Sequence, residues 1–214
     1  MLLIRKEIKI QDIQNSITGN RWSFGNEILY EMCRKNPKHK NSDVIVGKVW
    51  LIGRSYAAAI ERRKNTSEIN AGDDFYFNVV APKMLEIGEE LDKRIDNLKK
   101  FDSITKDNLK EIVGTHLFLT NVFQEISGQD KRSLASKYLH FHVPNMIYIY
   151  DSRAIRGARS YVNPDKQLRA LLVPFGDKEY IELVIRLFAF QEYVKNQYGI
   201  TMTPREIDTF LLSH

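Results

Sequence analysis

The stretch RSLASKYLHFHVPNMIYIYDSRA, residues 132–154, decides the fold because it places two helical patterns on either side of an extended run. Its first part repeats apolar residues at three- and four-residue steps, which return to one side of a helix: Leu134, Tyr138 and Phe141. Lys137 lies near the edge of that apolar side. Pro144 disfavours helical geometry in the residue before it, so this helix should end there.

The second part of the stretch contains MIYIY at 146–150, which is either a short strand or an extended loop. Asp151 follows directly and precedes SRAIRGARSYV, a helical pattern. An aspartate in that position caps a helix by accepting a backbone N–H, which is the structural explanation for this residue. The alternative is functional: Lys137 and Asp151 would be a nucleophile and a carboxylate brought together across the turn.

Helical patterns also dominate the chain before this stretch. The segment 42–63 begins at Ser42, a plausible N-cap, and presents a broad apolar face over about six turns. A second pattern, 76–98, is interrupted by Pro82, which should start or kink a helix.

Further cap and stop residues place helix ends around and after residues 132–154. The segment 105–128 begins at Thr105 as cap and ends at Gly128, a usual stop residue, and Asp130 can cap the helix that follows. The segment 177–199 again runs from an aspartate to a glycine, and 203–214 opens with a capping box and a first-position proline: Thr203, Pro204 and Glu206. Without a repeat or linker, residues 1–214 are predicted to form a single all-α domain.

Composition limits the class of protein. Of the 214 residues, 43% are hydrophobic and 28% are charged, which predicts a packed core and excludes global disorder. A lone cysteine, Cys33, excludes an internal disulfide and a cysteine metal cluster, and its helical pattern favours a packing role. A reducing cytoplasm is the simplest compartment. The N-terminus MLLIRKEIKI does not look like a secretory signal, and no apolar run reaches the roughly 20 residues of a membrane span.

The charge favours a polyanionic partner. The formal net charge is +5, and the basic residues gather in three clusters, at 34–40, 54–64 and 131–137, whereas acidic residues concentrate at 86–96. Such asymmetry can create one basic face, and nucleic acid is the partner that this face would suit. The alternative is that each cluster is a solvated helix surface.

Common cofactor motifs are missing from the sequence. There is no GxxxxGK[ST], GxGxxG, HExxH or paired CxxC, so nucleoside triphosphate, dinucleotide and standard zinc chemistry receive no support. His140 and His142 form HFH, but on a helix they point about 200° apart, so they should not share a metal. His116 lies in an apolar helix face and is expected in the core. No metal or cofactor is therefore expected.

The pattern SxxSKYLHFxxPxxxxIYDSRA, with the order helix, turn, helix bearing a lysine, extended connector and helix begun by an aspartate, resembles the helix-hairpin-helix DNA glycosylases. It is most similar to short bacterial proteins with an 8-oxoguanine DNA glycosylase-like fold. The resemblance implies the same helical fold, with a hairpin-like catalytic segment at about 105–161. It also implies that Lys137 attacks the sugar C1′ and that Asp151 assists departure of an altered base, with or without lyase activity.

The resemblance and the basic clusters together suggest how DNA would be bound. A lysine amine reacts only when it is neutral, and nearby cations such as Lys131, Arg132 and Arg153 would lower its pKa. The residues expected to contact DNA are Lys131, Arg132, Ser136, Arg153 and Arg54. A base removed from the stack needs an aromatic pocket. Candidates for that pocket are Trp22, Phe24, Trp50, Tyr56, His140 and His142, with the core as the alternative place for the first four.

Two other functions stay open at this point. Ala135 stands where the turn of these hairpins usually carries glycine, so the chain can also be a non-catalytic nucleic-acid-binding module of the same fold. A helical interaction protein, with basic clusters that serve solubility alone, is the third possibility. The sequence does not choose between DNA repair and phage defence, and it does not identify the base.

Overall fold

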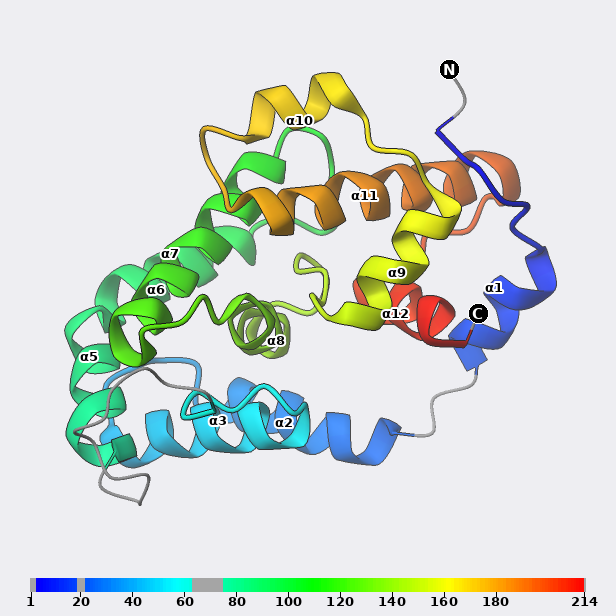
Figure 1. Ribbon diagram of the computed structural model, residues 1–214. Coiled ribbons are helices and arrows are strands. Elements are labelled where there is room, and N and C mark those ends of the chain that lie inside the picture. The colour runs from blue at the N-terminus through cyan, green and yellow to red at the C-terminus, as the bar shows by residue number, and fades with distance from the viewer. Residues whose placement is uncertain (1–2, 19–21, 63–74, 214) are drawn as a thin grey trace.

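The computed structural model describes residues 3–18, 22–62 and 75–213 (Figure 1). These residues form eleven α helices and one short π helix, which confirms the all-α prediction. They contain a single isolated antiparallel bridge, Ile4 to Val162, and no strand. The elements are α1 (Ile10–Thr18), α2 (Ser23–Lys35), α3 (Ser42–Ser55), the π helix η1 (Tyr76–Val80), α5 (Ala81–Glu86), α6 (Gly88–Leu98), α7 (Leu109–Ser127), α8 (Arg132–His142), α9 (Ser152–Tyr161), α10 (Lys166–Leu172), α11 (Lys178–Tyr198) and α12 (Pro204–Ser213).

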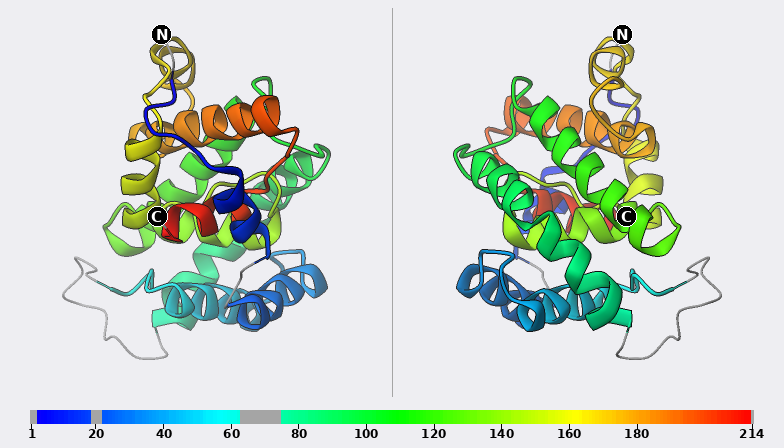
Figure 2. Two further views of the ribbon diagram at one scale, coloured as in Figure 1. Left: turned by 90° about the vertical axis from the view of Figure 1, so that its right-hand side faces the viewer. Right: turned by 90° about the vertical axis from the view of Figure 1, so that its left-hand side faces the viewer.

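Helix α8 occupies the middle of the molecule. It contacts α2 and α3 on one side and α7 on the other. Both views of Figure 2 place α2 and α3 on one side of α8, whereas α10 and α11 lie on its other side. All but its first few residues are buried, because neighbours surround it. The helix predicted in the first part of residues 132–154 is thus the central helix of the fold.

Several predicted helix ends are confirmed at the level of single hydrogen bonds. The side chain of Asp177 accepts from the N–H of Tyr180 at 2.9 Å. Gly128 and Gly199 end α7 and α11 in the left-handed conformation, with φ of 67° and 69°. In the capping box before α12, the Thr203 N–H donates to the Glu206 carboxylate at 2.6 Å.

Three other predicted caps are wrong. Asn41 caps α3 in place of Ser42, by accepting from the N–H of Val44 at 3.0 Å. Helix α7 begins only at Leu109, after Thr105 has donated its N–H to the side chain of Asn108. Asp130 does not cap α8, because its carboxylate pairs with the guanidinium of Arg132 at 2.9 Å.

Two long predicted helices are shorter or divided. The segment 42–63 stops at Ser55, because Ala57 adopts a φ of 50°, where a non-glycine residue cannot continue a right-handed helix. Residues 63 and 64, the end of the second basic cluster, lie outside the described residues. The segment 76–98 divides into η1, α5 and α6, and Pro82 lies in the first turn of α5, as a helix-starting proline should.

The core contains the residues that were expected to have packing roles. Cys33 is buried, and burial raises the pKa of its thiol to about 12. His116 is also buried and stacks on the ring of Tyr180, with 3.5 Å between the ring centroids. In the part of the chain that the structure describes, no helix has the length and apolar character needed to cross a membrane.

Candidate active site

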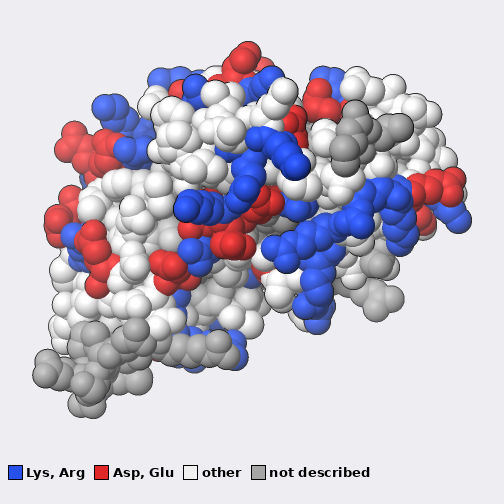
Figure 3. Space-filling model, turned by 45° about the horizontal axis from the view of Figure 1, so that its top comes forward, with Lys and Arg blue, Asp and Glu red and all other residues white. Residues whose placement is uncertain are grey.

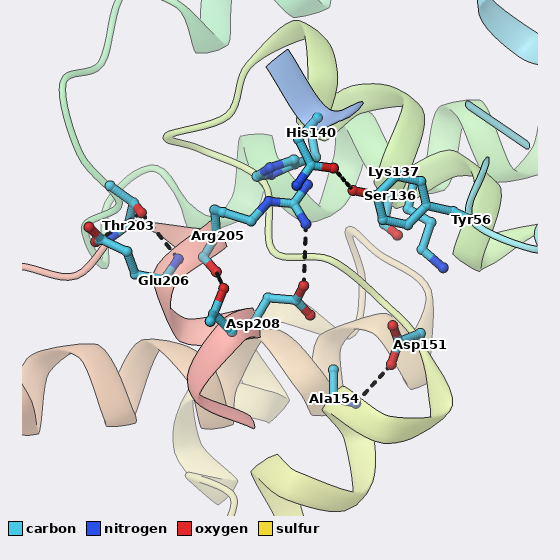
Figure 4. A network of polar contacts seen from close by, with 12 residues as sticks. Tyr56, Ser136, Lys137, His140, Asp151, Ala154, Thr203, Arg205, Glu206 and Asp208 are labelled. Carbon is cyan, nitrogen blue, oxygen red and sulfur yellow. Dashed lines mark hydrogen bonds and ion pairs between the residues drawn. The ribbon is translucent and has the colours of Figure 1, made fainter. Parts of the chain in front are cut away.

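A cavity of about 1190 Å³ lies between α2, α8, α12 and the start of α9. Its wall includes charged and aromatic side chains from distant parts of the sequence: Tyr56, Lys137, Asp151, Arg153, Arg205 and Asp208. Figure 4 shows that Lys137, Asp151 and Asp208 reach the same region from three different elements. Lys137 and Asp151, the two candidate catalytic residues of segment 132–154, therefore line one cavity.

Lys137 lies on α8 with only 3% of its surface exposed. Its Nζ donates to the hydroxyl of Ser133, one turn earlier, at 2.9 Å, and lies 5.5 Å from the centre of the Tyr56 ring. Burial lowers the pKa of this amine, and Arg205 adds to the effect, whereas Asp151 and Asp208 oppose it. A lowered pKa increases the fraction of neutral amine, which is the nucleophilic form. Burial and Arg205 thus take the place of the cations expected from the sequence.

Asp151 is fixed by the backbone of the helix that it begins. Its Oδ1 accepts from the N–H groups of Arg153 and Ala154, at 2.9 and 2.8 Å. The predicted helix cap is therefore confirmed, and it does not remove the carboxylate from the cavity. A hydrogen bond of 3.0 Å from the N–H of Tyr150 to the hydroxyl of Ser136 joins the connector to α8. This bond holds the residue before Asp151 against the residue before Lys137.

Arg205 and Asp208 on α12 were not identified from the sequence. The Arg205 guanidinium donates to the Tyr30 hydroxyl at 3.2 Å and lies 3.4 Å from Oδ2 of Asp208. Its carbon also lies 5.7 Å from the ring centres of both Tyr56 and Phe141. Burial raises the pKa of the Asp208 carboxyl to about 7, although Arg205 opposes this shift. In the sequence, an arginine and an aspartate three residues apart look like an ordinary surface pair of a helix.

The candidate base pocket is only partly assembled. Tyr56 and Trp22 line the cavity, but Phe24 and Trp50 do not. The core alternative is wrong for three of these residues, since the exposed fractions of Trp22, Phe24 and Trp50 are 79%, 81% and 43%. Two aromatic side chains of the predicted set therefore stand on the cavity wall.

The two histidines of HFH lie behind the cavity wall and not on it. His140 is buried between the carbonyl of Ile147, at 2.8 Å from Nδ1, and the Tyr30 hydroxyl, at 2.7 Å from Nε2. His142 is buried with its ring centre 5.2 Å from that of His39. Neither can face a base in the cavity. The described residues contain no group of three or more His, Cys, Asp or Glu side chains arranged to hold a metal ion.

Only one of the five predicted DNA contacts is exposed at the cavity, namely Arg153. Ser136 is buried and supports the connector. Arg132 pairs with Asp130 and Asp177, at 2.9 and 2.7 Å. The other two also have partners within the protein: Lys131 donates to the carbonyl of Arg62, and Arg54 pairs with Glu61.

Helix α9 carries two further arginines that were not among the predicted DNA contacts. Arg156 and Arg159 follow Arg153 at intervals of three residues and are exposed. Steps of three residues keep side chains on neighbouring positions of one helix face, with about 4.5 Å of rise between them. None of the three has an ion pair with any residue described here. Figure 3 shows lysine and arginine side chains gathered in a band across one face of the molecule.

Comparison with known proteins returned no relative. No family model, no curated protein and no solved structure matches the chain.

Proposed function

We propose that the chain is a DNA glycosylase-like enzyme that removes an altered base by cleaving its N-glycosidic bond. Lys137 would be the nucleophile and Asp151 the carboxylate that assists departure of the base. The observation that carries this proposal is that a buried lysine and a helix-capping aspartate line the same cavity. Ligand pockets commonly measure about 300–1,000 Å³, so a cavity of this size can accept an extruded nucleotide.

The order of elements supports the more specific fold. Helix α7 ends at Gly128, a short turn leads to α8 with Lys137, and the connector 143–150 leads to Asp151 at the start of α9. This is the order of the helix-hairpin-helix glycosylases that the sequence resembles. The likeness rests on this segment, because the turn itself has no glycine-rich run.

The chemistry of the two residues suits this reaction. Breaking an N-glycosidic bond builds positive charge on the sugar, and a fixed carboxylate stabilises that charge. Asp151 is held in place by two backbone N–H groups and needs no reorganisation. Lys137 is desolvated, so its neutral amine is available to attack C1′ and form a Schiff base with the sugar.

DNA is the partner that the surface beside the cavity favours. Arg153 stands at the cavity, and Arg156 and Arg159 continue along the same helix without ion pairs to described residues. Unpaired guanidinium groups in a row can neutralise successive phosphates. The row would hold the backbone while one nucleotide enters the cavity.

Borohydride trapping on a duplex with an abasic site tests the proposal without knowledge of the target base. The wild-type protein should form a covalent adduct, and Lys137→Ala should form none. Lys48→Met is a matched control, because Lys48 is also buried but does not line the cavity. It should form the adduct at the wild-type rate.

Other outcomes reject the proposal in different ways. An adduct that persists in Lys137→Ala would show that another lysine reacts. Absence of an adduct, together with salt-dependent binding of the same duplex, would favour a non-catalytic DNA-binding module. Absence of both would favour a helical interaction protein.

A further inference from the structure

The cavity holds a second carboxyl group to which the proposed reaction gives no role. Asp208 projects from α12, is almost fully buried, and lines the same cavity as Lys137 and Asp151. We propose that Asp208 is the proton-transfer partner of Lys137: it takes the proton of the ammonium before attack and returns it to the departing base. This inference rests on the proposed glycosylase function and assigns a third side chain to that site.

The hydrogen bonds of Asp208 leave half of its carboxyl group free. Its Oδ2 lies 3.4 Å from Nη1 of Arg205, a long contact, and its Oδ1 is buried without a hydrogen-bond partner among the described residues. A buried polar atom without a partner is uncommon and usually has a functional explanation. A proton on this carboxyl group would break no strong hydrogen bond.

Asp151 is less suited to carry a proton. Its Oδ1 already accepts two backbone N–H groups at the start of α9. Protonation there would weaken the helix cap, because a protonated oxygen is a poorer acceptor. The two carboxyl groups therefore divide the work: one keeps its charge beside the sugar, and the other exchanges a proton.

The surroundings of Asp208 place this exchange near neutral pH. Burial raises the pKa of its carboxyl to about 7, and Asp151 acts in the same direction, while Arg205 and Lys137 oppose it. The titratable groups that face it come from five parts of the chain: Arg205 on α12, Lys137 on α8, Asp151 before α9, Tyr30 on α2 and Tyr56 at the end of α3. A proton-transfer group works best when its pKa is close to the operating pH.

The path between the two groups runs through the cavity. Lys137 donates to Ser133 and forms no direct ion pair with Asp208, although the charge of each acts on the other. The cavity is large and lined by polar groups, so a water molecule between them can relay the proton. Figure 4 shows Lys137 and Asp208 on either side of this space.

The proton balance of the reaction closes with this assignment. The Asp208 carboxylate takes a proton from the Lys137 ammonium and leaves a neutral amine. The lone pair of the amine forms a bond to C1′ while the C1′–N bond to the base breaks, and the base leaves with that electron pair. The base then takes the proton from Asp208. Finally, the C1′–O4′ bond opens, and a proton passes from the attacking nitrogen to O4′ as the Schiff base forms.

The test is the pH dependence of single-turnover borohydride trapping from pH 5.5 to 9. The wild-type rate should rise with pH through about 7, as the Asp208 carboxyl ionises. Asp208→Asn should lower the rate at pH 7 by about 100-fold, a usual contribution of acid–base catalysis, and should recover only at alkaline pH, where the lysine loses its proton unaided. Asp208→Glu keeps a titrating group and should restore a rise near neutral pH.

The outcomes separate this inference from the proposed function. If the wild-type protein forms no adduct at any pH, the glycosylase proposal fails. If Asp208→Asn has the wild-type pH profile, or a uniformly lower rate with an unchanged profile, Asp208 is a structural residue and only this inference is overturned. Thermal melting of each variant shows whether it folds, and Asp208→Glu decides the question if Asp208→Asn does not.

Discussion

Two buried lysines, Lys48 on α3 and Lys137 on α8, differ in whether a substrate can reach the amine. Lys48 projects from α3, has none of its surface exposed, and has no hydrogen-bond partner for Nζ among the described residues. Lys137 is almost as buried, but it lines a cavity. Burial lowers the pKa of both amines, that of Lys48 to about 8. The same electrostatic effect produces a potential nucleophile only where a substrate can reach it.

Buried polar side chains lie near Lys48 and bind one another. Near Lys48, Asp92 binds Nδ1 of His39 at 2.6 Å, and Nε2 of His39 lies 2.7 Å from the Tyr138 hydroxyl. We call these three residues the closed chain, since all are buried. Tyr138 is the neighbour of Lys137 on α8, so the closed chain fixes the position of that helix. The closed chain positions α8, whereas Lys137 lines the cavity.

The largest expected effect comes from replacing each lysine by methionine. Lys137→Met should reduce the trapping rate by about 10³-fold or more, because it removes the proposed nucleophile. Lys48→Met should leave that rate unchanged and raise the free energy of unfolding by about 1–3 kcal/mol, because a desolvated amine without a partner is removed. Trapping and urea denaturation of both variants measure this contrast. A trapping defect in Lys48→Met would show that the two sites are coupled.

Breaking the closed chain should affect stability more than chemistry. Asp92→Ala removes the acceptor of the His39 ring and leaves a buried polar group without its partner, so the free energy of unfolding should fall by about 3 kcal/mol. Asp208→Ala removes a carboxyl group that has only one long contact and should cost less. Urea denaturation of the two variants at pH 7 compares them directly. Equal losses would contradict the distinction between the two regions.

Acid should lower the free energy of unfolding, because the core contains buried histidines. Burial lowers the pKa of His116 to about 4 and that of His140 to about 3. A histidine whose pKa is lower in the folded state binds its proton more readily when unfolded, so stability falls as the pH drops from about 6.5 toward 4. The loss should be on the order of 3 kcal/mol for a buried histidine. Urea denaturation at pH 7 and pH 4 measures it.

His116→Phe is the variant that isolates this effect. It keeps an aromatic ring stacked on Tyr180 but has no group to protonate. Its stability should therefore fall less than that of the wild type between pH 7 and pH 4. An unchanged difference would mean that His116 does not contribute to the acid sensitivity.

The smallest expected effects concern the arginine row beside the open cavity. Each of Arg153→Ala, Arg156→Ala and Arg159→Ala should weaken DNA binding several-fold and reduce the slope of log affinity against log salt by about 0.9. Arg54→Ala is the control, because Arg54 pairs with Glu61 within the protein. Fluorescence anisotropy over a range of salt concentrations measures the slopes. Equal slopes for Arg54→Ala and the α9 variants would argue against α9 as the binding surface.

Local signals in the sequence predicted the parts of the fold that neighbouring residues determine. Asp177, Gly199 and the capping box at Thr203 could be predicted because each acts within one helical turn. The shift of a cap from Ser42 to Asn41 arises because both residue types can cap, and the surrounding chain selects one.

Contacts between distant segments could not be predicted from residue patterns. The pairing of Arg205 with Tyr30 joins the last described helix to the second, and no spacing in the sequence records it. The closed chain likewise joins three separate segments. Ion pairs within the protein also occupy basic residues that looked available for DNA, such as Arg132. Lys137 and Asp151 were placed together by a resemblance of the whole stretch, not by their spacing.

The position of α12 has a consequence for the newly synthesised protein. This helix packs against α1 and α9 and supplies both Arg205 and Asp208 to the cavity. A growing chain that has emerged only as far as α11 carries Lys137 and Asp151 but lacks one wall of the cavity. Because domains begin to fold during translation, the ribosome holds an incomplete site until residues 204–213 are released. The order of synthesis thus completes the surroundings of Lys137 last.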